Sequence, residues 1–74
     1  MAKTPRVTAR QLVRVATKLG FVFSRQSGSH AIYINAQGVR ATVPIHGSAV
    51  LHPKIIKTFI EDARISEEVF KKLL

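Results

Sequence analysis

The sequence predicts an α+β fold, a two-layer sandwich in which two helices pack on one face of a three-stranded antiparallel sheet. Three observations predict it: an apolar stripe with helical spacing near the start, three short segments separated by turn residues, and a second helical stripe after Pro53. With 74 residues, the chain is expected to form a single domain, 1–74, with a thin hydrophobic core.

The first helix is expected over residues 9–19, after a loose start over residues 1–7. Thr8 is a good N-cap, and Gln11 three positions later completes a capping-box pattern. Gly20 follows as a residue that can end the helix. One face of this helix is apolar, through Leu12, Val15, Ala16 and Leu19, and another face is cationic, through Arg10, Arg14 and Lys18.

Three strands are expected over residues 21–26, 30–34 and 39–43. The first two flank the turn Ser27-Gly28-Ser29, and the third follows the turn at residues 35–38. Strict alternation places some side chains of each strand on the core face: Phe21 and Phe23, then His30, Ile32 and Ile34, then Val39, Ala41 and Val43. Tyr33 would then point to the outer face, either covering the sheet or stacking on a base.

The second helix is expected to begin at Pro53, with His52 as an unusual cap. Its apolar stripe, which should be core, comprises Ile55, Ile56, Phe59, Ile60 and Ala63. Ser66 and the two acids after it predict a short terminal helix. Its apolar residues, expected to fold back onto the core, are Val69, Phe70 and Leu73.

Charge is distributed unevenly along the chain. The net charge is +8, residues 1–60 contain no acid, and the acids Glu61, Asp62, Glu67 and Glu68 lie together near the end. Such asymmetry favours a polyanionic partner, most often nucleic acid. We expect no signal peptide and no membrane-spanning segment, which together with the absence of cysteine suits a cytoplasmic domain.

The element order is similar to that of the double-stranded-RNA-binding-domain fold, and four motifs resemble the HicA toxin family of bacterial toxin–antitoxin systems. The motifs are Leu19-Gly20-Phe21, Arg25-Gln26-Ser27-Gly28-Ser29-His30, Val43-Pro44-Ile45-His46-Gly47 and Arg64-Ile65-Ser66-Glu67-Glu68-Val69-Phe70. One departure is Leu51-His52-Pro53, where the family often has a glycine-threonine pair.

The resemblance implies a toxin that cleaves mRNA, with the histidine of Gly-Ser-His as its catalytic residue. At His30 that implication outweighs the ordinary role of a histidine beside a turn, which is to bond the loop. The resemblance also implies a partner antitoxin of the HicB type that covers the active site.

Histidine suits ribonuclease chemistry because RNA carries its own nucleophile, the 2′-OH. An imidazole with an unperturbed pKa of about 6.5 can take that proton near neutral pH. Arg25 and Arg40 are expected to hold the scissile phosphate, with help from the Gly28 and Ser29 amides. The other cations expected to contact RNA are Arg10, Arg14, Lys18, Lys54 and Lys57.

The remaining histidines leave alternatives open. His46 is either a second proton carrier or a surface loop residue, and His52 is a capping or surface residue. The three histidines match no compact metal-ligand motif, and the first 60 residues offer no carboxylate, so neither metal nor cofactor is expected. Two other functions compete with the ribonuclease: a non-catalytic RNA-binding module, and an interaction domain for an acidic protein.

Overall fold

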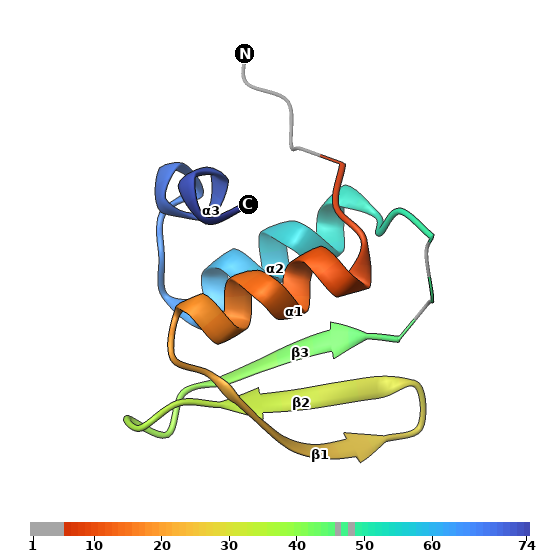
Figure 1. Ribbon diagram of the computed structural model, residues 1–74, viewed down its shortest axis with the longest axis vertical. Helices are drawn as coiled ribbons and strands as arrows, with labels where there is room; N and C mark the ends of the chain where they lie inside the picture. The colour runs from red at the N-terminus through yellow and green to blue at the C-terminus, as the bar shows by residue number, and fades with distance from the viewer. Residues whose placement is uncertain (1–5, 46, 48) are drawn as a thin grey trace.

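One helix, three strands and two further helices follow one another in the computed structural model, which describes residues 6–45, 47 and 49–74 (Figure 1). Their bounds are α1 (Ala9–Lys18), β1 (Val22–Ser27), β2 (His30–Ile34), β3 (Arg40–Pro44), α2 (Pro53–Ala63) and α3 (Glu67–Leu73). The strands form one antiparallel sheet in the order β1-β2-β3. This confirms the α+β arrangement, like that of the double-stranded-RNA-binding domain.

The helix ends form as local sequence dictates. In the capping box of α1, the Thr8 amide donates to the Gln11 side chain at 2.9 Å, and the Gln11 amide donates to the Thr8 hydroxyl at 3.3 Å. The amide of Lys54 donates to Nδ1 of His52 at 3.0 Å, so this histidine caps α2. Ser66 caps α3 by accepting from the Val69 amide at 3.1 Å. All three predicted caps are therefore confirmed.

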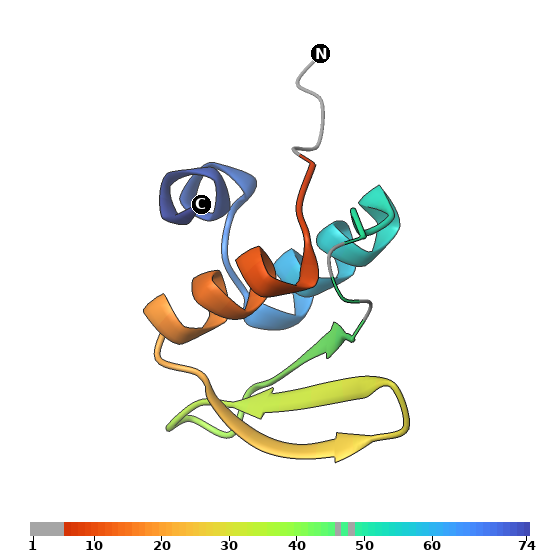
Figure 2. The same cartoon turned by 45° about the vertical axis from the view of Figure 1, so that its right-hand side comes forward.

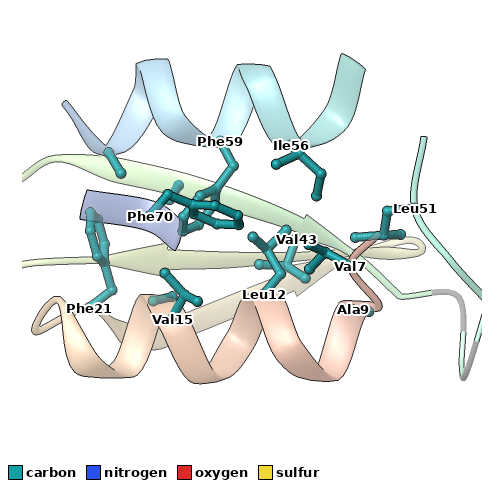
Figure 3. Packing of buried hydrophobic residues seen from close by; sticks show 13 residues of the cluster. Val7, Ala9, Leu12, Val15, Phe21, Val43, Leu51, Ile56, Phe59 and Phe70 are labelled. Atoms are coloured by element: carbon teal, nitrogen blue, oxygen red, sulfur yellow. The ribbon is translucent and has the colours of Figure 1, made fainter. Parts of the chain in front are cut away.

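The core lies between the sheet and the helices. Both α1 and α2 pack against β3, while α3 lies on the side of the helix pair that faces away from the sheet (Figures 1 and 2). Figure 3 shows Phe70 of α3 reaching inward to Phe59 of α2, and the two rings meet edge to face at 6.0 Å. The largest fully buried side chains are Phe59, Phe70, Leu12, Ile56, Val7, Val15 and Val43.

Two expectations about the chain ends do not hold. Val7, placed in a loose start by the sequence, is fully buried, and its carbonyl accepts from the Leu51 amide at 2.8 Å. This bond ties the segment before α1 to the segment before α2. Val69, expected in the core, is 40% exposed because α3 turns Phe70 inward instead. Residues 1–5 lie outside the described part of the chain.

The core face of β2 is the reverse of the prediction. Ala31 is buried and Tyr33 packs against the core, whereas His30 is exposed and neither isoleucine of β2 joins the core cluster. The register explains the reversal: Ala31 lies opposite Val43 and Tyr33 opposite Ala41, and directly opposed residues of an antiparallel pair share a face. Because Ala41 and Val43 of β3 face the core, their partners Tyr33 and Ala31 face it as well.

We call the other side of the sheet the His30 face, which the helix pair leaves uncovered except along β3, where Thr42 and Pro44 border α2. By register it carries Val22, Arg25, Ser27, His30, Ile32, Ile34, Arg40, Thr42 and Pro44. Phe23 belongs to the opposite side, where its ring meets Tyr33 edge to face at 5.8 Å. Because no helix extends over this part of β1, Phe23 remains 56% exposed, and the expectation that it is a core residue is wrong.

Candidate nucleic-acid interface

A two-residue turn presents His30 at the start of β2. Ser27 pairs directly with His30, which leaves Gly28 and Ser29 as the turn. Gly28 has φ +58°, and Ser29 is not among the residues with positive φ, which is the pattern of a type II′ hairpin turn. Glycine is therefore favoured at the first turn position, because residues with a side chain are strained there.

The turn is held from two sides. The Gln26 side chain donates to the Gly28 carbonyl at 3.0 Å, within the hairpin. The Ile45 amide donates to the Ser29 carbonyl at 2.7 Å, which extends the β2–β3 ladder past the end of β3. The backbone around His30 is therefore fixed by both neighbouring segments.

His30 itself is exposed at the rim of the sheet. Among the described residues, no side chain or backbone group forms a hydrogen bond with its ring. A histidine in the helix-facing row would have been shut away behind the core. Its place on the His30 face leaves the imidazole able to reach a bound molecule.

A β-bulge brings Arg25 onto the same face. Phe23 pairs with Tyr33 and Arg25 pairs with Ile32, so Ser24 is the extra residue between them. Strict alternation would have put Arg25 on the side of Phe23; the bulge moves it to the side of His30. Arg25 and His30 become diagonal neighbours on adjacent strands, with Cα atoms roughly 7–8 Å apart, within the reach of an arginine side chain.

Arg40 shares the face but lies at its far end. It pairs with Ile34, whereas the partner of His30 is Pro44, four residues further along β3. At about 3.3 Å per residue the separation along the strand is about 13 Å. Arg25 is therefore the arginine of this face that lies nearer to His30, and Arg40 lies at the opposite end of the sheet.

The two lysines of α2 line different depressions. Lys54 borders a groove between α2 and β3, whose other lining residues are Thr42, Pro44, Ile55, Thr58 and Asp62. Lys57 borders a smaller depression with Ile60, Glu61 and Glu67, on the α3 side. Only Lys54 is thus close to the strand that pairs with β2. The groove between α2 and β3 could not be predicted from the residue pattern, because it depends on how α2 packs beside β3.

The cationic stripe of α1 lies in the helix layer. Arg10 and Arg14 are exposed there, and the ammonium of Lys18 donates to the Leu73 carbonyl at 2.9 Å. Lys18 therefore links α1 to the end of α3 as well as carrying charge. Because the His30 face is on the other side of the sheet, this stripe forms a second cationic surface.

The other histidines fall into two cases. His52 is the N-cap of α2 and its Nδ1 is occupied by the Lys54 amide. His46 lies outside the described residues, so its suggested role as a proton carrier stays a prediction. Within residues 6–45, 47 and 49–74, no three histidine or acidic side chains lie close enough to hold a metal ion together.

Two observations bear on the wider identity of the chain. Over the same described ranges, none of the helices has the length and apolarity needed to cross a membrane. No curated protein matches the chain significantly.

A family model does match. It is the model of the HicA toxin of bacterial toxin–antitoxin systems, and it covers residues 9–65, from the first residue of α1 through the end of α2. The match spans the His30 hairpin, the groove and both cationic surfaces described above. Membership of a toxin–antitoxin family also implies an antitoxin partner. The chain belongs to the HicA family of toxins.

Proposed function

We propose that this protein is an mRNA interferase: an endoribonuclease that cleaves mRNA in the cytoplasm with His30 as general acid and base and without a metal ion. The observation that carries the proposal is the exposed imidazole of His30, unengaged by the described residues and set diagonally to Arg25 on one face. Family membership supports the toxin role, and the geometry supports the chemistry.

In the proposed reaction, the neutral His30 ring takes the proton of a ribose 2′-OH. The 2′ oxygen attacks the adjacent phosphorus, the bond to the 5′ oxygen breaks, and the leaving oxygen receives a proton from solvent or from the imidazolium. The products are a 2′,3′-cyclic phosphate and a 5′-OH end. The nucleophile belongs to the substrate, so the step itself needs no cofactor.

The reaction also requires stabilisation of the negative charge on the phosphate oxygens. The Arg25 guanidinium can form two parallel hydrogen bonds to phosphate oxygens, and the turn amides of Gly28 and Ser29 offer neutral donors beside it. Because the transition state carries more charge on these oxygens than the ground state, such donors lower the barrier. Arg40 on the same face and Lys54 at the adjoining groove would hold neighbouring phosphates.

The antitoxin partner fits the same surface. Val22 is 63% exposed on the His30 face, where Ile32 and Ile34 lie beside it, and Arg25 and Arg40 flank these apolar residues. A HicB-type antitoxin with an apolar centre and acidic rim would bury this patch and cover His30. Inhibition would then follow from simple occlusion of the imidazole.

The test replaces His30 by alanine and follows cleavage of an mRNA fragment on denaturing gels in the presence of EDTA. Loss of a positioned general base should slow cleavage by about 10²–10⁴-fold. His52→Asn is the matched control, because asparagine also caps helices and the residue lies outside the His30 face. Circular dichroism checks that both variants fold.

Two results would count against the proposal. Undiminished cleavage by His30→Ala would remove His30 from the chemistry. Binding of RNA by the wild-type protein with no cleavage at all would favour the non-catalytic RNA-binding module instead.

A further inference from the structure

A groove of about 210 Å³ lies between α2 and β3, and family membership assigns it no role. Its lining combines apolar Pro44 and Ile55 with two threonines, and it holds one cation and one carboxylate. Lys54 is at one end of α2 and Asp62 is eight residues later, about 12 Å along the helix at 1.5 Å per residue. The groove is therefore a short trough with a cation at one end and a carboxylate at the other.

The strand wall of the groove is continuous with the His30 face. Pro44 is the direct cross-strand partner of His30, and Thr42 is the partner of Ile32. Directly opposed residues in an antiparallel pair have Cα atoms about 4.5–5.5 Å apart. A molecule that lies in the groove thus has one edge within a single strand spacing of the histidine.

The charges within the groove select the part of a nucleotide that fits there. An ammonium beside Pro44 suits a phosphate next to the one at His30. A carboxylate repels phosphates and, when ionised, only accepts hydrogen bonds. The Asp62 end therefore suits a group with N–H donors, and in RNA the groups rich in such donors are the bases.

Resting on the proposed ribonuclease function, we propose that this groove binds one base of the RNA beside the scissile phosphate and that Asp62 selects guanine there. Guanine presents N1–H and the 2-amino group side by side, which match the two oxygens of one carboxylate. Uracil has a single N–H between two carbonyl oxygens, which the carboxylate repels. The planar base rests on Pro44 and Ile55, as extruded bases in enzyme pockets pack against aromatic or apolar side chains.

The first experiment compares the wild-type protein with Asp62→Asn on a pool of random-sequence RNA oligonucleotides, and the new 5′ ends are sequenced. A bidentate base contact is typically worth five-fold to 150-fold in discrimination, so guanine should be enriched at least about fivefold at one position beside the cleaved bond. Asp62→Asn should lose this enrichment, because its amide N–H₂ faces the guanine donors.

Glu61→Gln is the matched control. It makes the same change of charge at the next residue of α2, but Glu61 lines the depression on the α3 side. Its base preference should equal that of the wild type. Circular dichroism again checks the fold of each variant.

The second experiment replaces the favoured guanosine by inosine, which lacks the 2-amino group, in a short substrate. The replacement should slow wild-type cleavage about fivefold or more and leave the Asp62→Asn rate unchanged. The Asp62 carboxylate and the guanine 2-amino group are the two partners of one contact, so removing the second has no effect once the first is gone. Equal sensitivity to inosine in both proteins would overturn the proposal. Unaltered base preference in Asp62→Asn, with weakened binding of an antitoxin, would also overturn it and assign the groove to a protein partner.

Failure of the base-site proposal can be distinguished from failure of the ribonuclease proposal. If the wild-type protein leaves RNA intact, the ribonuclease proposal fails. The same guanosine and inosine oligonucleotides then serve as binding probes, followed by fluorescence anisotropy. A preference for guanosine that disappears in Asp62→Asn would support the base site, and its absence in the wild type would overturn it.

Discussion

Gly28 is the residue on which presentation of His30 depends. Its φ of +58° is strained for any L side chain, yet a Cβ at this position would have no described atom within 4 Å apart from those of its two chain neighbours. The cost of a substitution is therefore purely conformational. Gly38, with φ +79° and equally open surroundings, occupies the turn at the other end of β2 and supplies a comparison.

Gly28→Ala and Gly38→Ala should each lower the free energy of unfolding by about 1–2 kcal/mol, as expected for forcing alanine into a left-handed conformation. Only Gly28→Ala should also slow RNA cleavage under conditions where both proteins are fully folded, because relaxation of its turn displaces His30. Urea denaturation and a cleavage assay measure the two effects. Equal cleavage rates for the two variants would show that cleavage does not depend on the geometry of the turn at Gly28.

Individual residues also show how far sequence reasoning reaches. The position of His30 beside a glycine turn follows from local preferences, and the structure agrees. The side of the sheet on which His30 lies does not follow from local preferences, because isoleucine and tyrosine both suit a strand. The pairing of β2 with Ala41 and Val43 decides which residues of β2 face the core. The same holds for Arg25, whose face depends on a bulge at Ser24 that alternation cannot reveal.

At the scale of elements, α3 contributes more to the core than its seven residues suggest. Phe70 is fully buried and contacts Phe59, whereas its neighbour Val69 is 40% exposed. Two adjacent residues of one short helix thus differ sharply in how much they contribute to the stability of the core. The apolar stripe of α2 was readable from sequence, but the depressions on its two sides were not, since each needs a neighbour packed in three dimensions.

Phe70→Ala should lower the free energy of unfolding by about 3–5 kcal/mol, because it leaves a cavity beside Phe59. That is a large share of the 5–15 kcal/mol typical of a domain. Val69→Ala should change it by no more than about 0.5 kcal/mol. Thermal and urea unfolding followed by circular dichroism would reveal the difference, and similar values for the two variants would show that α3 is not part of the cooperative core.

For the whole molecule, the main feature is charge on two separate surfaces. Arg25 and Arg40 lie on the His30 face, while Arg10 and Arg14 lie on the exposed side of α1. The net charge of +8 would attract a polyanion such as the proposed RNA substrate to either surface at long range. Only phosphate contacts that persist in the complex, however, contribute to the salt dependence of binding.

The double variant Arg25→Gln/Arg40→Gln should therefore flatten the plot of log binding constant against log salt by about 1.4, the loss of two single-strand phosphate contacts. The matched variant Arg10→Gln/Arg14→Gln removes the same charge and should leave the slope close to that of the wild type. Anisotropy titrations of a short RNA at several salt concentrations give both slopes. A larger change from the α1 variant would place the RNA on the helix layer.

Every residue of β1 is exposed, and among the strands that the structure describes β1 pairs with β2 alone. Local opening of this hairpin edge thus costs much less than unfolding of the core. Deuterium should enter the β1 amides long before it enters those of α2. The toxin can therefore open the β1–β2 hairpin, and with it the proposed RNA-cleaving surface around His30, for short periods while its aromatic core stays folded.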